Sequence, residues 1–359
     1  MSACKVLALT RYGRKGASSR MRFEQFLPVL AELGVNVQIS PLLRDEYLER
    51  LYSRQPKSIR HILTDYLHRL PWLMQAGRFD LLWIEKELFP DLPGWFESLL
   101  KLLGIRYVVD YDDAIFHNYD LSANPLRRML GGKVDALMRN ASLVVCGNRY
   151  LADRAVAASA RRVEILPTVV DLTRYSVRPS AYSEKLIVGW VGSAATVKYL
   201  NIAIPALRAL SKEYPVQLRV IGAEFSATGI DVDCRLWSEN EEVHQIQQFD
   251  IGIMPLTDSP WERGKCGYKL IQYMACGVPV IASPIGVNEV IVEDGVSGYL
   301  AKDQDGWLDA FRSLASDSSA RQILGSRGRQ LVEERYCLQV IAPRLAKLLK
   351  EVSIPEGIR

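Results

Sequence analysis

Short apolar runs alternate with longer segments of helical periodicity along most of the chain. In the first half, runs typical of buried strands occupy 5–10, 35–40, 79–85, 106–111, 141–147 and 162–167. Segments of helical periodicity separate them, and the first covers 19–34, where Gly34 suits a helix C-cap. Strands that alternate with helices are typical of parallel α/β sheets. The first half is therefore predicted to be a doubly wound α/β domain.

A second set of the same kind begins at residue 186. Its strands are predicted at 186–193, 216–223, 249–256 and 279–284, with a helix over 199–214. Before this set, "RPSAYSEK" (178–185) combines a proline with small polar residues, as linkers do. We predict an N-terminal domain over 1–178, a linker over 179–185, a C-terminal domain over 186–340, and a C-terminal helix over 341–359 that could pack back on the first domain.

Two tandem doubly wound domains would place their strand C-termini and helix N-termini across a shared cleft. In such sheets, ligands bind outside the carboxyl ends of the strands, and helix N-termini favour phosphate. This architecture predicts a nucleotide-like ligand in the cleft, before any single motif is considered.

Composition fits a protein of this kind. The chain has 359 residues, 48% of them hydrophobic and 24% charged, which is typical of soluble globular domains. No apolar run approaches the length needed to cross a bilayer, and the apolar stretch near the N-terminus is too short for a signal peptide. The six cysteines are scattered, as expected of reduced thiols. We therefore expect a cytoplasmic protein.

The net charge of +4 is unevenly distributed, because the excess of Lys and Arg lies in residues 1–175. Such a half could attract phospholipid headgroups or a phosphorylated acceptor, although normal scatter explains it equally well. Within it, 44–78 mixes basic residues with Leu, Tyr and Trp. This region could lie on an anionic membrane, which would place the protein peripherally on the inner face of the cell membrane. The alternative is an ordinary amphipathic helix that packs on the sheet.

The segment "GKCGYKLIQYMACGVPVIASPIG" (264–286) combines a glycine turn with the start of a helix. Free backbone N–H groups and two ammonium groups would seat a diphosphate there. Lys265 and Lys269 share a helical face and repel each other unless an anion lies between them. Gln272 follows on that side and could hydrogen-bond sugar hydroxyls. A surface helix with incidental lysines is the alternative. The predicted donor-binding residues of this segment are Lys265, Cys266, Gly267, Tyr268, Lys269 and Gln272.

The loop "TRYGRKGASSR" (10–20) follows the first strand and leads into the first helix. Gly16 and Ser18 would allow a phosphate or sugar to approach the backbone closely. Arg20 and Arg22 at the helix start oppose the helix dipole unless they face an anion. A flexible surface loop is the alternative.

Residues 269–301, "KLIQYMACGVPVIASPIGVNEVIVEDGVSGYLA", resemble the donor-binding signature of glycosyltransferase family 4. Members of that family are retaining, nucleotide-sugar-dependent enzymes of the GT-B fold. The residues that match its pattern are Met274, Ala275, Gly277, Pro279, Val280, Gly286, Glu289, Asp294, Gly295 and Gly298. The stretches 5–34 and 165–175 are also similar to family segments. The resemblance implies an α/β protein of the GT-B fold, with two tandem doubly wound domains that face a cleft.

The chain departs from the family pattern at three charged positions. Gly264 and Gln272 replace two glutamates that usually contact the donor sugar and ribose, and Glu262 lies two residues before the first of these positions. The family's Arg and Lys, which grip the diphosphate, map onto Ser193 and Lys198 in "GSAATVK", the segment that begins with Gly192. The resemblance implies that Gly192, Ser193 and Lys198 line the donor site, and Glu262 would reach it only if its loop were displaced. We infer that Lys265 or Lys269 supplies the missing positive charge.

Three carboxylates, those of Asp110, Asp112 and Asp113, lie at the end of the strand predicted at 106–111. The first two resemble the metal site of the other large glycosyltransferase fold, but GT-B enzymes generally need no bound metal. The family's acceptor-side His-Asp pair maps onto Asp112 and Asp113, where a carboxylate could orient or deprotonate the acceptor hydroxyl. His117 is the rival catalytic residue, although a single histidine is more often a surface or capping residue.

The sequence thus predicts a retaining glycosyltransferase that acts in cell-surface glycan biosynthesis. Its donor would be a nucleoside diphosphate sugar and its acceptor a glycan or a lipid-linked sugar, with no cofactor, no obligatory metal and no nucleic acid. The alternatives are a catalytically silent sugar-nucleotide-binding or scaffold protein and a nucleotide-sugar epimerase of the GT-B fold, which Gly264 and Gln272 disfavour. A nicotinamide dehydrogenase is disfavoured, since no G-x-G-x-x-G follows a predicted strand.

Overall fold

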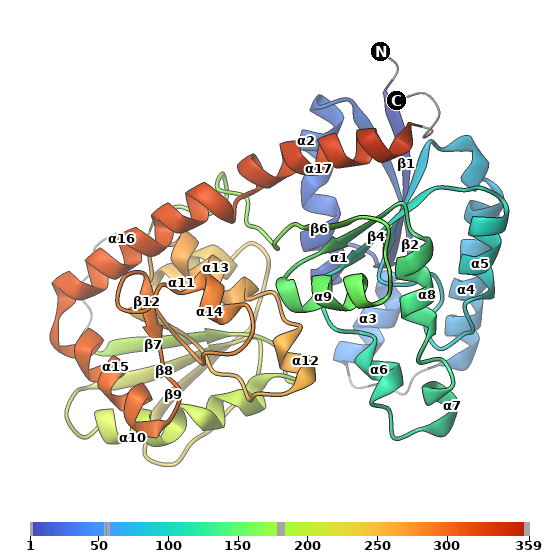
Figure 1. The fold of residues 1–359 in the computed structure, drawn as a ribbon. Coiled ribbons are helices and arrows are strands. Elements are labelled where there is room, and N and C mark those ends of the chain that lie inside the picture. Colours follow the sequence, from blue (N-terminus) through green and yellow to red (C-terminus); the bar gives the residue numbers. More distant parts are fainter. Residues whose placement is uncertain (1–2, 54, 56–57, 178–183, 355–359) are drawn as a thin grey trace. The chain divides into compact units, whose positions relative to one another are not determined.

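The computed structural model describes residues 3–53, 55, 58–177 and 184–354, and the chain divides into two compact units (Figure 1). Unit 1 comprises Met1–Thr168 and Ile341–Arg359, and unit 2 comprises Val169–Val340. The first boundary therefore falls at Thr168 and not at 178, because a β-bridge between Val170 and Cys337 ties the following segment to unit 2. Most of the predicted linker, residues 179–183, lies outside the described residues.

Unit 1 contains a six-stranded parallel sheet in the order β2-β1-β3-β4-β5-β6. The strands β3, β4 and β5 are buried at every position, as expected for strands inside a parallel sheet, whereas the edge strands β2 and β6 are partly exposed. Their bounds are β1 (Cys4–Tyr12), β2 (Val35–Leu43), β3 (Leu81–Glu85), β4 (Tyr107–Tyr111), β5 (Leu143–Cys146) and β6 (Val163–Ile165).

Helices connect these strands, and the last one, α17, begins in unit 2 and continues into unit 1. The helix predicted over 19–34 is interrupted at Phe23, and a new helix starts where Pro28 occupies the first turn, the one place where its missing N–H costs nothing. The bounds are α1 (Ala17–Arg22), η1 (Glu24–Phe26), α2 (Leu27–Glu32), α3 (Asp45–Tyr52), α4 (Ile59–Met74), η2 (Ala76–Arg78), α5 (Trp95–Leu102), α6 (His117–Asp120), α7 (Pro125–Arg128), α8 (Lys133–Asn140), α9 (Arg149–Ala157) and α17 (Leu338–Ser353).

Unit 2 repeats the architecture with a parallel sheet in the order β12-β11-β10-β7-β8-β9. The strands at its two edges, β9 and β12, were not predicted, because one is mostly polar and the other is very short. The strand bounds are β7 (Leu186–Val191), β8 (Val216–Ile221), β9 (Asp231–Arg235), β10 (Ile251–Met254), β11 (Val280–Ala282) and β12 (Gly298–Leu300).

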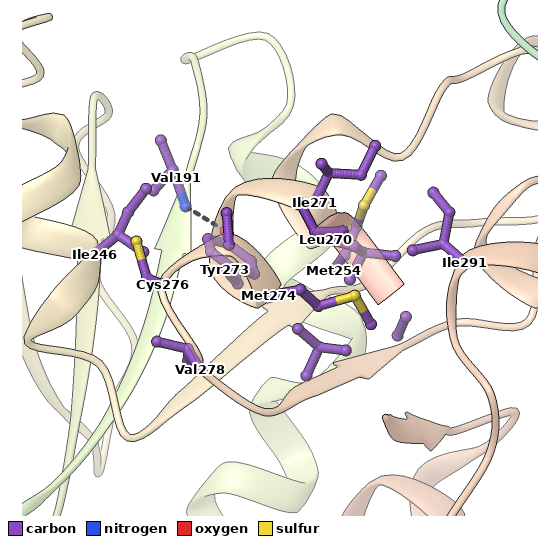
Figure 2. Close-up of a cluster of buried hydrophobic side chains, with 14 of the residues drawn as sticks. Val191, Ile246, Met254, Leu270, Ile271, Tyr273, Met274, Cys276, Val278 and Ile291 are labelled. Carbon is purple, nitrogen blue, oxygen red and sulfur yellow. Dashed lines mark hydrogen bonds between the residues drawn. The ribbon is translucent and has the colours of Figure 1, made fainter. Parts of the chain in front are cut away.

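Helix α13 lies at the centre of a hydrophobic cluster in unit 2, between the sheet and α16 (Figure 2). The backbone N–H of Val191 donates to the Tyr273 hydroxyl at 2.9 Å, which fixes α13 against the end of β7. On the other side α16 approaches closely, since an added Cβ on Gly325 would lie 2.1 Å from the carbonyl oxygen of Gly277. The helix bounds are η3 (Val197–Ile202), α10 (Ile204–Leu210), α11 (Glu242–Gln247), α12 (Pro260–Arg263), α13 (Tyr268–Ala275), α14 (Asn288–Ile291), α15 (Gln304–Ser316) and α16 (Ser318–Arg335).

None of the helices in the described part of the chain is both long and apolar enough to cross a membrane.

Candidate functional site

Each sheet reverses its strand order beside its first strand. In unit 1, β2 lies on one side of β1 and β3 lies on the other; in unit 2, β8 and β10 flank β7 in the same way. Parallel α/β sheets bind ligands outside the carboxyl ends of their strands at such a switch point. All the predicted site residues lie in or near loops and helices that follow strands of one of the two sheets.

In unit 2, the loop after β7 folds over the indole ring of Trp190. An added Cβ on Gly192 would lie 2.4 Å from that ring, so a larger residue would displace the loop. The Nζ atom of Lys269, on α13, lies 5.4 Å from the centroid of the same ring, which is a cation–π distance. Ser193 is exposed in this loop, and its carbonyl accepts the N–H of Thr196 at 2.9 Å. The loop after β7 and the start of α13 therefore meet on Trp190.

The buried carboxylate of Glu262, on α12, joins the segment before α13 to η3. Glu262 accepts hydrogen bonds from the hydroxyls of Tyr199 and Ser259. Burial raises the pKa of Glu262, but these two hydrogen bonds and the charge of Lys265 outweigh it, so the pKa is lowered and the group stays ionised. The Nζ atom of Lys198 lies 5.3 Å from the ring centroid of Tyr199. Glu262 thus anchors the loop before α13 against η3, and both of its oxygens are engaged.

Glycine is required where α13 begins. Gly267 has a left-handed backbone (φ 65°), and an added Cβ would lie 2.3 Å from Cδ1 of Ile291. Cys266 is buried just before it, and Tyr268 is half-buried at the first helical position. This tight turn brings Lys265 and Lys269 to the N-terminal end of the helix, where backbone N–H groups favour an anion.

Gln272 does not extend this surface. It is buried, and its side-chain amide donates to the hydroxyl of Tyr175 at 2.7 Å. That hydroxyl donates in turn to Glu242 at 3.1 Å, and the indole N–H of Trp237 donates to the other oxygen of Glu242 at 2.7 Å. The structure therefore places Gln272 in an internal network, which connects it through Tyr175 to Glu242 on α11.

In unit 1, the predicted residues Ser18, Asp112 and Asp113 come together around a buried lysine. The Ser18 hydroxyl donates to Asp112 at 2.5 Å. Lys86 Nζ lies 2.8 Å from the other Asp112 oxygen, 3.1 Å from the Ser18 hydroxyl and 3.7 Å from Asp113. Lys86 directly follows β3 and has a left-handed backbone (φ 64°). We name this group of four residues the Lys86 cluster.

The Lys86 cluster holds Asp112 as a carboxylate. Burial raises the pKa of Asp112, but the charge of Lys86 and the hydrogen bonds from Lys86 and Ser18 outweigh it, so the pKa is lowered. Burial also disfavours the charged form of Lys86, and the two aspartates overcome it and raise its pKa. Such a carboxylate is a weak base but a good hydrogen-bond acceptor. It is suited to orient a hydroxyl group rather than to remove its proton completely.

Two other predicted residues of unit 1 have structural partners. An added Cβ on Gly16 would lie 2.4 Å from Cβ of Tyr12, so glycine allows the loop after β1 to fold back on that strand. Arg22 does face an anion, but the anion is the buried Asp110, which it binds through two nitrogens at 2.8 and 3.1 Å. Arg22 also donates to the carbonyl of Leu166 at 2.9 Å. This pair ties α1 to β4 and is not aimed at a ligand.

His117 belongs to a network between α6 and α9. Its Nδ1 lies 2.8 Å from Asp120, and its Nε2 lies 2.8 Å from the hydroxyl of Tyr150. Arg154 extends the network by an ion pair with Asp120 at 3.1 Å. Because both ring nitrogens are engaged by side chains, the arrangement fits a structural role for His117 better than the catalytic one.

Sequence reasoning missed Trp190, Lys86 and Glu242 as parts of these sites. The sequence could have indicated the first two as site residues, because Trp190 lies near the end of a predicted strand and Lys86 directly follows another. Nothing in the sequence indicated Glu242, since only the fold brings α11 next to α13. Within the described residues, no group of three or more His, Cys, Asp or Glu side chains could hold a metal ion. That the protein needs no metal stays a prediction.

Comparison with known proteins shows similarity to glycosyltransferases. Residues 185–317 match the model of the family "Glycosyl transferases group 1". WcaL of Escherichia coli (strain K12), named as a colanic acid biosynthesis glycosyltransferase, is 25% identical over 259 residues, which cover 66% of this chain and 63% of WcaL. The matched segment thus spans less than two thirds of that relative.

Solved structures agree over nearly the whole chain. Sucrose-phosphate synthase from Thermosynechococcus elongatus superposes with a TM-score of 0.72 at 15% identity, covering 97% of this chain and 99% of that one. Anabaena Alr3699/HepE, solved in complex with UDP-glucose, superposes with a TM-score of 0.68 at 15% identity, covering 97% and 99%. The fold is therefore that of GT-B glycosyltransferases, as predicted.

Within that fold, residues 185–317 are similar to the group 1 glycosyl transferases. The resemblance to glycosyltransferases is confirmed at this level, and the activity of the whole protein is a proposal. Membership of family 4 in particular stays a prediction.

Proposed function

We propose that this protein transfers a sugar from a nucleoside diphosphate sugar to a glycan or lipid-linked acceptor, with retention of the anomeric configuration. One observation carries the proposal: the loop after β7 and the start of α13 meet on Trp190 and bring Ser193, Lys198 and Lys269 to the switch point of unit 2. A group 1 glycosyltransferase domain supplies the reaction class.

The donor would bind with its diphosphate beside Lys198, Lys265 and Lys269. Their ammonium groups and the first N–H groups of α13 would offset the charge that develops on the leaving phosphate. The structural neighbour HepE was solved with UDP-glucose, which supports a nucleotide-sugar donor for this fold. Glu262 accepts hydrogen bonds from the hydroxyls of Tyr199 and Ser259, so its first role would be to hold the loop in place.

The acceptor would bind beside the Lys86 cluster of unit 1. Asp112 would accept a hydrogen bond from the acceptor hydroxyl and orient its oxygen toward the anomeric carbon. The bond from that carbon to the diphosphate breaks as the bond to the acceptor oxygen forms. The acceptor proton passes to the leaving phosphate, so no strongly basic side chain is needed. Closure of the two units would exclude water.

The biological context is proposed to be cell-surface glycan biosynthesis. WcaL, whose name places it in colanic acid biosynthesis, supports a polysaccharide context. A lipid-linked acceptor would also suit a protein in the cytoplasm that attaches peripherally to the inner face of the membrane.

The test is a turnover assay with a panel of nucleotide sugars. Thermal unfolding first identifies the nucleoside diphosphate that stabilises the protein most. The matching sugar donors are then incubated with the protein, and release of the nucleoside diphosphate is measured, with and without added acceptors. Release above the rate without protein supports the transferase, and nuclear magnetic resonance of the product then reports its anomeric configuration.

A catalytically silent nucleotide-binding protein is the second candidate. Gly264 and the buried Gln272 offer no acid to the donor, and the oxygens of Glu262 are engaged. In that case a nucleoside diphosphate would stabilise the protein, but no nucleoside diphosphate would be released from any sugar donor, with or without an acceptor. That result would overturn the transferase and retain the donor site.

A further inference from the structure

Helix α4 exposes a row of apolar side chains and buries two charged ones, which is unusual for a surface helix. Ile59, Leu63 and Leu67 follow one another at four-residue spacing and are 74%, 57% and 63% exposed. Asp65 and Arg69, also four residues apart, are only 3% and 1% exposed. A helix on a soluble domain normally turns its apolar stripe toward the core. The apolar stripe of α4 is therefore left outside the core of unit 1.

Polar contacts attach the inner face of α4 to the rest of the unit. Asp65 accepts from Arg44 at 2.7 Å, and Arg69 donates to the carbonyl oxygens of Thr10 and Ser40. These contacts hold the helix without its exposed residues Leu63 and Leu67. The exposed stripe is thus a fixed feature of the fold.

Helix α5 continues this apolar face. Trp95, Leu99 and Leu102 are exposed at positions i, i+4 and i+7, which share one side of a helix. The connections from β2 to β3 and from β3 to β4 advance across the sheet in the same direction, so right-handed crossovers place α4 and α5 on the same face (Figure 1). The ring of Phe89 lies between them, with its centroid 5.3 Å from that of Tyr66 on α4 and 4.6 Å from that of Phe96 on α5.

Helix α7 is tied to the same loop, because Arg127 pairs with Asp91 at 2.8 Å. Leu126 and Met129 are exposed there. We name these side chains together the outer apolar surface; it comprises Ile59, Leu63, Leu67, Met74, Trp95, Leu99, Leu102, Leu126 and Met129.

The charges on α4 and α5 have one sign wherever they are exposed. Both helices are described throughout, and their only two acids, Asp65 and Glu97, are buried. Asp65 binds Arg44, and Glu97 lies 3.7 Å from the buried Lys133. The charged residues that remain exposed are Arg60 and Lys101, and both are basic.

We propose that the outer apolar surface docks on an anionic lipid bilayer. Leucine and tryptophan side chains would enter the boundary between headgroups and acyl chains, while Arg60 and Lys101 would contact lipid phosphates. A symmetric contact with a second copy of this chain would bring like charges together, which disfavours that occupant. The inference deepens the peripheral membrane position proposed above by naming the face that binds, and it does not depend on sugar transfer.

The test is flotation of the full-length protein with phosphatidylcholine vesicles, with and without phosphatidylglycerol. The wild type is expected to float with the anionic vesicles. The triple variant Ile59→Gln, Leu63→Gln, Leu67→Gln should bind these vesicles at least about tenfold more weakly than the wild type. It loses apolar side chains that enter the bilayer. Its matched control replaces exposed apolar residues on other elements, Val156→Gln, Val296→Gln and Ile323→Gln, and should float like the wild type.

A second variant tests the charges. Arg60→Gln with Lys101→Gln should weaken binding to anionic vesicles by about fivefold for each charge removed, and added salt should reduce the difference. Binding that is equal on neutral and anionic vesicles would contradict the lipid selectivity.

The proposal is overturned if the wild type does not float with anionic vesicles, or if the triple variant floats as well as the wild type does. Light scattering tests the other occupant, a second copy of this chain. If the wild type forms a dimer, the triple variant does not, and the wild type does not bind vesicles, the surface would be assigned to a second copy. Thermal unfolding verifies that the variants fold. Stabilisation by a nucleoside diphosphate, measured on the same samples, reports on the donor site independently, so failure of either proposal is visible without the other.

Discussion

The two units stabilise the charges beside their switch points in different ways. In unit 1, Lys86 lies against the carboxylates of Asp112 and Asp113, and Arg22 lies against that of Asp110. In unit 2, Lys198 and Lys269 lie against the rings of Tyr199 and Trp190. A carboxylate cancels the charge of its partner, whereas an aromatic ring holds a cation in place and leaves its charge intact.

This difference fits the division of roles proposed for the two units. A site for a diphosphate needs positive potential, and a cation–π contact positions a lysine without itself adding a negative charge. A site for a neutral sugar hydroxyl needs an oriented hydrogen-bond acceptor, and an ion pair such as Lys86–Asp112 provides one. The four predictions below test this contrast.

The largest effect is expected from the buried ion pair of unit 1. Arg22→Met would leave the Asp110 carboxylate buried without its partner, which should lower the free energy of unfolding by about 3–5 kcal/mol. Urea unfolding followed by circular dichroism measures the change. Arg149→Met is the control, because Arg149 and Asp153 form an exposed pair on α9, and it should change stability by less than about 1 kcal/mol. Equal losses in the two variants would show that burial of the pair is unimportant.

The second effect concerns the turn that orients Lys265 and Lys269 in unit 2. Gly267→Ala would add left-handed strain of about 1–2 kcal/mol, and the clash with Ile291 would add about 1–3 kcal/mol more. Gly295→Ala separates the cost of backbone strain from the cost of the clash. Gly295 also has a left-handed backbone (φ 70°), but no atom lies within 4 Å of an added Cβ. Urea unfolding should show a larger loss for Gly267→Ala. Equal losses would remove the packing argument for this turn.

Much of the fold follows from the sequence, because buried parallel strands are apolar runs with clear ends. Prolines divide two predicted helices, one at Pro28 and one at Pro205, and both breaks could have been read from their positions. The edge strands β9 and β12 could not, since their residues lack the apolar pattern of central strands. The boundary at Thr168 also depends on a long-range pairing, that of Val170 with Cys337.

The candidate site was predictable where it lies within one continuous segment. The turn at Gly267 and the lysines beside it belong to a single motif, so their proximity follows from local geometry. The partners of Gln272 do not, because Tyr175 and Glu242 are distant in the sequence. The same holds for Lys86, which meets Ser18 and Asp112 only through the order of β1, β3 and β4.

The third prediction concerns the pH dependence of the Lys86 cluster. The folded-state pKa of Asp112 is lowered, so its ionised form stabilises the folded state above the unfolded-state pKa of about 3.9, and this contribution is lost as the pH falls further. Asp112→Asn should therefore cost about 1–3 kcal/mol at neutral pH, and the difference from the wild type should shrink below about pH 4. Urea titrations at stepped pH values measure it.

Asp153→Asn is the control for this measurement. Asp153 forms an exposed pair, so its replacement should change stability by less than about 1 kcal/mol at each pH. An Asp112→Asn difference that persists unchanged below about pH 4 would mean that shape rather than charge matters at this position.

The smallest expected effect is on binding, at the lysine that packs on Trp190. Lys269→Met keeps an apolar stem over the indole ring but removes the charge, so the fold should persist. The affinity for the most strongly stabilising nucleoside diphosphate should fall about tenfold to a hundredfold, as expected for the loss of a charged hydrogen bond. Isothermal titration calorimetry measures it, and raising the salt concentration should weaken the wild type more than the variant. Lys212→Ala, at an exposed lysine of unit 2, should bind like the wild type. If Lys269→Met also retained full affinity, the positive potential would have to come from other groups, and the contrast between the two units would no longer explain where the diphosphate binds.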